Sequence, residues 1–188
     1  WSQDYYAGFP AGQFYFPIPA LMVVILNVIL PYNIAFKLVT ASGAVFLPAA
    51  AYVLGRGLKV RFPGPAFMGV ATLGLLFFAG DPRAGQPYST AAFNQRIMGG
   101  TLASTLAGEF SFTIALCFAL CFLGVFAMTL RGNKRPGWAA LLLAATVLSH
   151  LVVGIFVGIA ALTFLAFRFF ADSRRKQGVT VGALLLLT

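Results

Sequence analysis

Long, nearly uncharged apolar segments constrain this chain more than any other feature of its sequence. They fall at 16–30, 34–54, 63–79, 110–130, 138–149, 151–167 and from 178 onward. A helix needs about 20 apolar residues to cross the hydrocarbon core of a bilayer, and several of these segments approach or exceed that length. Transmembrane strands would alternate polar and apolar residues, and these segments do not. We therefore predict an all-α, polytopic transmembrane protein.

The composition supports this class. Of the 188 residues, 60% are hydrophobic and 9% are charged, whereas a soluble domain averages about 25% charged residues. The net charge of +9 comes from short basic clusters between apolar segments, so we do not expect a nucleic acid partner. The sequence opens in an aromatic loop without an initiator Met and stops within an apolar stretch. We expect 1–188 to be a single transmembrane domain and a fragment of a longer chain.

Three basic clusters predict how the helices are oriented. They are Arg56/Lys59/Arg61, Arg131/Lys134/Arg135 and Arg168/Arg174/Arg175/Lys176. The positive-inside rule places all three in the cytoplasm. Outer loops are then expected at 1–15 and 80–109.

Two segments do not suit a simple crossing. The segment 16–30 is short and contains Pro17 and Pro19 at its start, so we predict a re-entrant or interfacial helix there. The stretch 138–167 has basic clusters at both ends but is short for two full spans. We predict that it forms a pair of short helices that meet near His150, covered by neighbouring helices.

Five blocks of sequence, in this order, resemble one group of proteins: YYAGFP, FYFPIPAL, LPYNIAFKLVT, GGTLASTLAGEFSF and LSHLVVGIF. The group is the bacterial 6-pyruvoyl-tetrahydropterin synthase-related membrane domain, a historical label that implies no pterin chemistry. The region 14–61 also resembles the GT-C superfamily of polyprenyl-phosphate-sugar-dependent glycosyltransferases. The resemblance covers most of the chain from Trp1 to about Phe167.

The resemblance implies a GT-C-like fold in the bacterial plasma membrane. It also implies sugar transfer from a polyprenyl-phosphate donor to a cell-envelope acceptor on the outer side. GT-C enzymes carry their catalytic carboxylate in the first outer loop, so that residue would lie upstream or be Asp4. The sequence requires no cofactor, and it is compatible with a divalent metal. The alternative is a non-catalytic structural membrane subunit of a larger complex, whose partners are membrane lipids and other membrane subunits.

Three residues are candidates for catalysis. Glu109 follows a run of small residues and precedes an apolar segment; it is interpreted as a general base or metal ligand, or as a helix-start carboxylate that interacts with the helix dipole. Asp4 lies among aromatic residues and suits either sugar binding or a solvated interfacial belt. His150, the only histidine, is a proton carrier or phosphate partner, or a neutral side chain bonded to a backbone carbonyl.

Four further residues are candidates for substrate binding. Arg96 is the first choice for the donor phosphate because a guanidinium binds phosphate in a bidentate manner. Lys37 is the second choice, with snorkelling toward lipid headgroups as its alternative. Trp1 and Tyr5 are candidates for stacking on sugar rings. The sequence contains no nucleotide-binding, zinc-protease or serine-hydrolase motif.

Overall fold

The computed structural model describes residues 16–78, 100–132 and 136–185. These residues form helices and turns, and no strand occurs among them. Three helical segments are long and apolar enough to cross a membrane: Tyr32–Gly57, Phe110–Leu130 and Leu151–Phe170. The all-α class is therefore confirmed for the described part of the chain.

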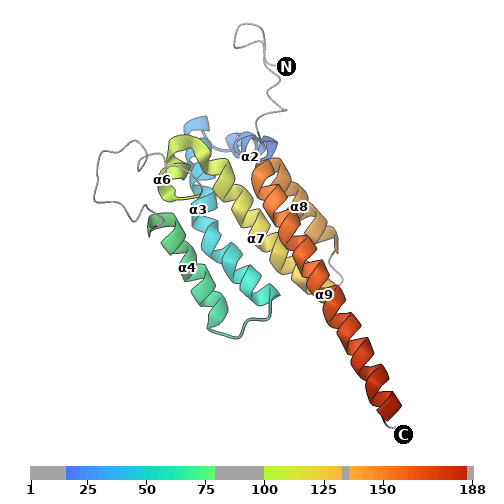
Figure 1. Cartoon of the computed structure of the whole chain (residues 1–188). Helices are drawn as coiled ribbons and strands as arrows, with labels where there is room; N and C mark the ends of the chain where they lie inside the picture. Colours follow the sequence, from blue (N-terminus) through green and yellow to red (C-terminus); the bar gives the residue numbers. More distant parts are fainter. Residues whose placement is uncertain (1–15, 79–99, 133–135, 186–188) are drawn as a thin grey trace, which may run out of the picture.

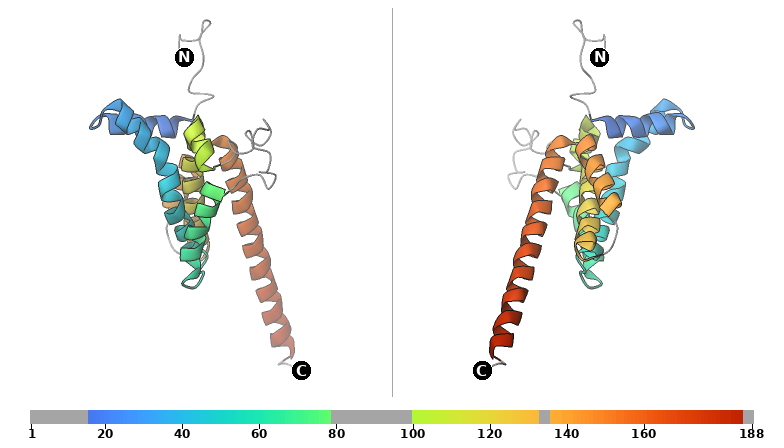
Figure 2. Two further views of the ribbon diagram at one scale, coloured as in Figure 1. Left: turned by 90° about the vertical axis from the view of Figure 1, so that its left-hand side faces the viewer. Right: turned by 90° about the vertical axis from the view of Figure 1, so that its right-hand side faces the viewer.

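The helices form a bundle with one crosspiece. In chain order the elements are α2 (Pro17–Asn27), α3 (Tyr32–Gly57), α4 (Gly64–Phe78), α6 (Leu102–Ser104), the π-helical η1 (Thr105–Glu109), α7 (Phe110–Leu130), α8 (Pro136–Ser149) and α9 (Leu151–Leu185). Figure 1 shows that the axes of α3, α4, α7, α8 and α9 are roughly aligned. The short α2 lies across one end of this bundle (Figure 2).

The bundle is organised around the contact between α3 and α7, its most extensive interface. A Cβ atom built on Gly43 would lie 2.7 Å from the backbone nitrogen of Ile114, and one built on Gly57 would overlap the backbone of Gly124. Cys117 donates a hydrogen bond from its Sγ to the Gly43 carbonyl at 3.1 Å. Small residues thus let the two backbones approach closely, as in many membrane helix pairs.

The same contacts show that α3 and α7 are parallel. Gly43 lies beside the first turns of α7, and Gly57, the last residue of α3, lies beside Gly124 near its end. Arg56 and Arg131, from two of the predicted basic clusters, therefore lie at one end of the bundle, here called the basic end. Glu109 lies at the other end, here called the Glu109 end.

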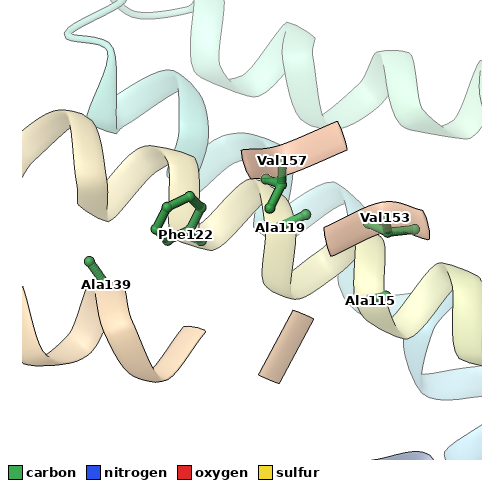
Figure 3. Close-up of a cluster of buried hydrophobic side chains, with 6 residues drawn as sticks. All are labelled: Ala115, Ala119, Phe122, Ala139, Val153 and Val157. Atoms are coloured by element: carbon green, nitrogen blue, oxygen red, sulfur yellow. The ribbon is translucent and has the colours of Figure 1, made fainter. Parts of the chain in front are cut away.

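Two apolar clusters attach α2, α8 and α9 to this pair. Figure 3 shows the first, in which α7 packs against α8 and α9 through Ala115, Ala119, Phe122, Ala139, Val153 and Val157. The second joins α2 to α3 and α7 through Val23, Ala35, Val39 and Ile114. Three of the six buried residues in the first cluster are alanines, which keeps α7 close to its neighbours.

Two helices meet at His150 as predicted, and α8 is short, but the prediction of a short helix is wrong for α9. The His150 N–H donates to the Thr146 carbonyl at 2.9 Å, and its carbonyl accepts from the Gly154 N–H at 3.0 Å, so one residue separates α8 from α9. The helix α9 has 35 residues and continues through the third basic cluster. Arg, Lys, Gln and Ala are strong helix formers, and the cluster contains no proline to stop the helix.

The prediction of an outer loop at 80–109 departs from the structure at its C-terminal end. Residues 80–99 lie outside the described residues, but Leu102–Glu109 is helical. Thr101 caps this short segment, because its side chain accepts a hydrogen bond from the Ser104 N–H at 3.0 Å. Gly108, with φ of 114°, then turns the chain into α7.

We expect Gly43→Ala to destabilise the protein, because the added methyl group would collide with the α7 backbone. Overpacking of this kind costs roughly 1–3 kcal/mol. The matched control is Gly158→Ala, since a Cβ there meets nothing within 4 Å. Thermal unfolding of the purified protein in detergent should show a lower midpoint for Gly43→Ala alone. Equal midpoints for the two variants would contradict the close α3–α7 contact.

Candidate functional site

A cavity of about 610 Å³ lies at the Glu109 end of the bundle. Its walls come from α2, the first turns of α3, the junction of η1 with α7, and the corner between α8 and α9. Four polar side chains line it: Tyr32, Glu109, Ser111 and His150. The other walls are apolar and include the rings of Phe16, Phe36 and Phe110. Segments far apart in sequence thus place a carboxylate and an imidazole in one cavity.

Glu109 is exposed to this cavity, and a buried serine holds its carboxylate. The Oγ of Ser104 donates a hydrogen bond to Oε2 of Glu109 at 2.9 Å, and Ser104 is fully buried. Glu109 immediately precedes α7, yet its side chain makes no capping hydrogen bond to that helix. The helix dipole still favours a negative charge at this position. Within the described structure, no hydrogen bond is made by the second carboxylate oxygen of Glu109, which can therefore accept one from a ligand.

His150 is packed between two aromatic rings. Its imidazole stacks on Phe16 with ring centroids 4.7 Å apart and meets the edge of Phe112 at 5.3 Å. Nδ1 is buried and has no hydrogen-bond partner among the described residues. None of the described residues therefore offers Nδ1 a backbone carbonyl.

Opposing effects act on the ionisation of His150. Burial lowers the pKa of its imidazole, because the charged form loses hydration, and the negative charge of Glu109 acts in the opposite direction. Burial is the larger effect. Burial therefore favours a neutral imidazole in this cavity near neutral pH.

The structure brings together some of the predicted site residues. Glu109 and His150 share the cavity, whereas Lys37 lines a separate groove between α3 and α4. Trp1, Asp4, Tyr5 and Arg96 lie outside the described residues. Within the described ranges, no group of three or more His, Cys, Asp or Glu side chains could hold a metal ion.

Sequence reasoning missed three contributors to this cavity. Ser104 lies in the run of small residues before Glu109, and no role of its own was predicted for it. The available signal was Thr101, a residue type that often caps a helix and that stands three residues earlier. Phe16 and Tyr32 flank α2 and contribute walls only because α2 folds across the bundle end. No local sequence signal indicates that crossing.

Comparison of the chain with protein-family models, curated proteins and solved structures finds no match. The fold and the cavity therefore define the protein at a broad level. Its described residues form only helices and turns, three of these helices are able to span a membrane by length and composition, and a cavity lined by a carboxylate and an imidazole lies at one end.

Because the chain has one histidine, the pKa of His150 is directly measurable by NMR titration of the imidazole carbons. We expect a pKa below the ordinary value of about 6.5. Glu109→Gln should lower it further, since the negative charge that favours the imidazolium is lost. Asp172→Asn, which removes a carboxylate from the later part of α9, serves as the control and should leave the pKa unchanged. An unchanged pKa in Glu109→Gln would contradict the coupling.

Proposed function

We propose that this protein is a GT-C-like glycosyltransferase of the bacterial plasma membrane and that the Glu109–His150 cavity is its acceptor site. The observation that carries the proposal is the exposed Glu109 carboxylate, held by Ser104 in a cavity of about 610 Å³. A carboxylate with one free oxygen suits the deprotonation of a hydroxyl group. The aromatic walls suit stacking on sugar rings, and the resemblance of the sequence to GT-C proteins supplies the reaction class.

The arrangement of charges supports an outer location for the cavity. Arg56 and Arg131 lie at the opposite end of the bundle, where the positive-inside rule predicts the cytoplasm. The eleven residues of α2 extend about 16 Å, roughly half of the hydrocarbon thickness. We propose that α2 lies at the outer interface, next to the headgroups where a polyprenyl-phosphate donor presents its phosphate.

The proposed reaction is a substitution at the anomeric carbon of the donor sugar. Glu109 takes the proton from the acceptor hydroxyl, and the hydroxyl oxygen forms a bond to that carbon. The bond between the carbon and the phosphate oxygen breaks, and polyprenyl phosphate leaves with the electron pair. The neutral His150 imidazole then accepts the proton from Glu109. Arg96 holds the donor phosphate in this proposal, and Asp4, Trp1 and Tyr5 bind sugar.

One observation favours a second function, that of a structural subunit. Only 17% of the 18-residue apolar stretch of α9 is buried, compared with 33% of the corresponding stretch of α3 and 39% of that of α7. Figure 2 shows that the later part of α9 also extends past the ends of the other helices. A helix with so little cover suits packing against other membrane helices. In this alternative the Glu109–His150 cavity has no catalytic role.

The two functions differ in the effect of Glu109→Gln. The assay measures the transfer of a labelled hexose or pentose from a polyprenyl-phosphate donor to cell-envelope lipids and glycans. The glycosyltransferase proposal predicts that Glu109→Gln abolishes this transfer. Thermal stability should change little, because Glu109 is exposed and the amide oxygen of Gln can still accept the hydrogen bond from Ser104. Asp172→Asn is the control and should retain activity. Transfer at the wild-type rate by Glu109→Gln would exclude the catalytic role.

Ser104 is expected to act as a positioning residue. Hydrogen bonds to charged groups contribute roughly 1.5–3 kcal/mol, so Ser104→Ala should lower kcat at least about tenfold with little change in KM. The control is Ser42→Ala, whose hydroxyl bonds to the Val39 carbonyl away from this cavity. A Ser104→Ala enzyme with the wild-type kcat would show that the hydrogen bond does not orient Glu109.

A further inference from the structure

A second feature of the fold is a groove on the side of the bundle, between α3, α4 and the segment formed by α6 and η1. Its volume is about 530 Å³, and it is separate from the Glu109–His150 cavity except that Phe36 lines both. The residues that matter here are Lys37, Ala41, Ala44 and Pro48 on α3, Leu76 on α4 and Leu106 on η1. We call it the α3–α4 groove.

The length of this groove matches one leaflet of a bilayer. On α3 its lining runs from Phe36 to Pro48, which corresponds to about 18 Å along the helix axis. Half of the hydrocarbon core measures about 15 Å. With Lys37 at headgroup level, the groove would end near the bilayer midplane.

The lining of the groove suits a hydrocarbon chain. It extends about 18 Å along α3, and its described lining is apolar apart from Lys37, Thr40 and Thr105. An extended acyl chain that lies along α3 would bury its apolar surface against these side chains.

The charge of the groove indicates the headgroup of its occupant. Lys37 is the one ionisable side chain in the described lining, and it is exposed at the start of α3. It has no ion-pair partner among the described residues, and no described carboxylate lines the groove. Below it, the hydroxyl of Thr40 is buried and unpartnered within the described structure. A negatively charged phosphate diester complements this end of the groove.

We propose that the α3–α4 groove is a binding site for one anionic phospholipid. One acyl chain lies in the groove, and the phosphate binds the Lys37 ammonium at the Glu109 end. The lipid covers the seam between α3 and α4 and contacts η1 through Leu106, on the segment that also carries Glu109. This proposal does not depend on glycosyl transfer, because a structural subunit would need the same lipid.

The test is native mass spectrometry of the full chain, purified from vesicles of phosphatidylglycerol and phosphatidylcholine in equal amounts. We expect one retained lipid per chain, with about a fivefold preference for phosphatidylglycerol, as for one lysine near a charged headgroup. Lys37→Gln should remove the preference, whereas Arg56→Gln at the basic end should keep it. Ala41→Phe should block retention, whereas Ala49→Phe, at an exposed alanine of α3 that does not line the groove, should not.

Several results would overturn the proposal. They are the absence of a retained lipid, equal retention of the two lipids by the wild type, and wild-type retention by Ala41→Phe. A polyprenyl phosphate identified as the retained lipid would also overturn it. A photoactivatable phosphatidylglycerol tests the site without any variant, and it should label α3 between 36 and 48 together with α4. Labelling confined to other helices would place the lipid elsewhere and refute the assignment.

Discussion

The close contact between the backbones of α3 and α7 is the constraint on which the rest of the structure depends. Gly43 and Gly57 have no room for a Cβ atom against α7, which fixes the register of the two helices. Because Gly43 meets the start of α7 and Gly57 meets its later part, the two helices run parallel. Every other long helix then packs on one member of this pair: α4 on α3, and α8 and α9 on α7. In a bilayer, where apolar surface alone does not drive association, such fitting of small residues supplies the stabilisation.

The register of this pair also creates the candidate site. Because α3 and α7 begin at the same end, Tyr32 and Phe36 face the residues that start α7, and Glu109 lies at their junction. The corner between α8 and α9 returns to the same end and adds His150, while α2 crosses above them. Ser104 then restrains the carboxylate through a bond within the same chain segment. The cavity is thus a consequence of helix direction and length.

Sequence reasoning predicted the helices best where apolar segments end at basic clusters. The bounds of α7 match the predicted 110–130, and the break at His150 follows from basic clusters on both sides. It was wrong about α9, because a charged segment rich in helix formers continues a helix as readily as it ends one. It missed the bond between Ser104 and Glu109, because the π-helical turn that joins them has no distinctive local pattern.

The sequence by itself determined the class of the protein: apolar segments, few charges and basic clusters require a helical protein suited to a membrane. Periodicity and composition are local properties of the sequence. They predict which segments are helical and which helix ends carry charge. Only the tertiary structure decided that Glu109 and His150 share a cavity while Lys37 lies in a separate groove. Those relations depend on which faces of distant helices meet, and they are set by small-residue contacts such as that of Gly43 with Ile114.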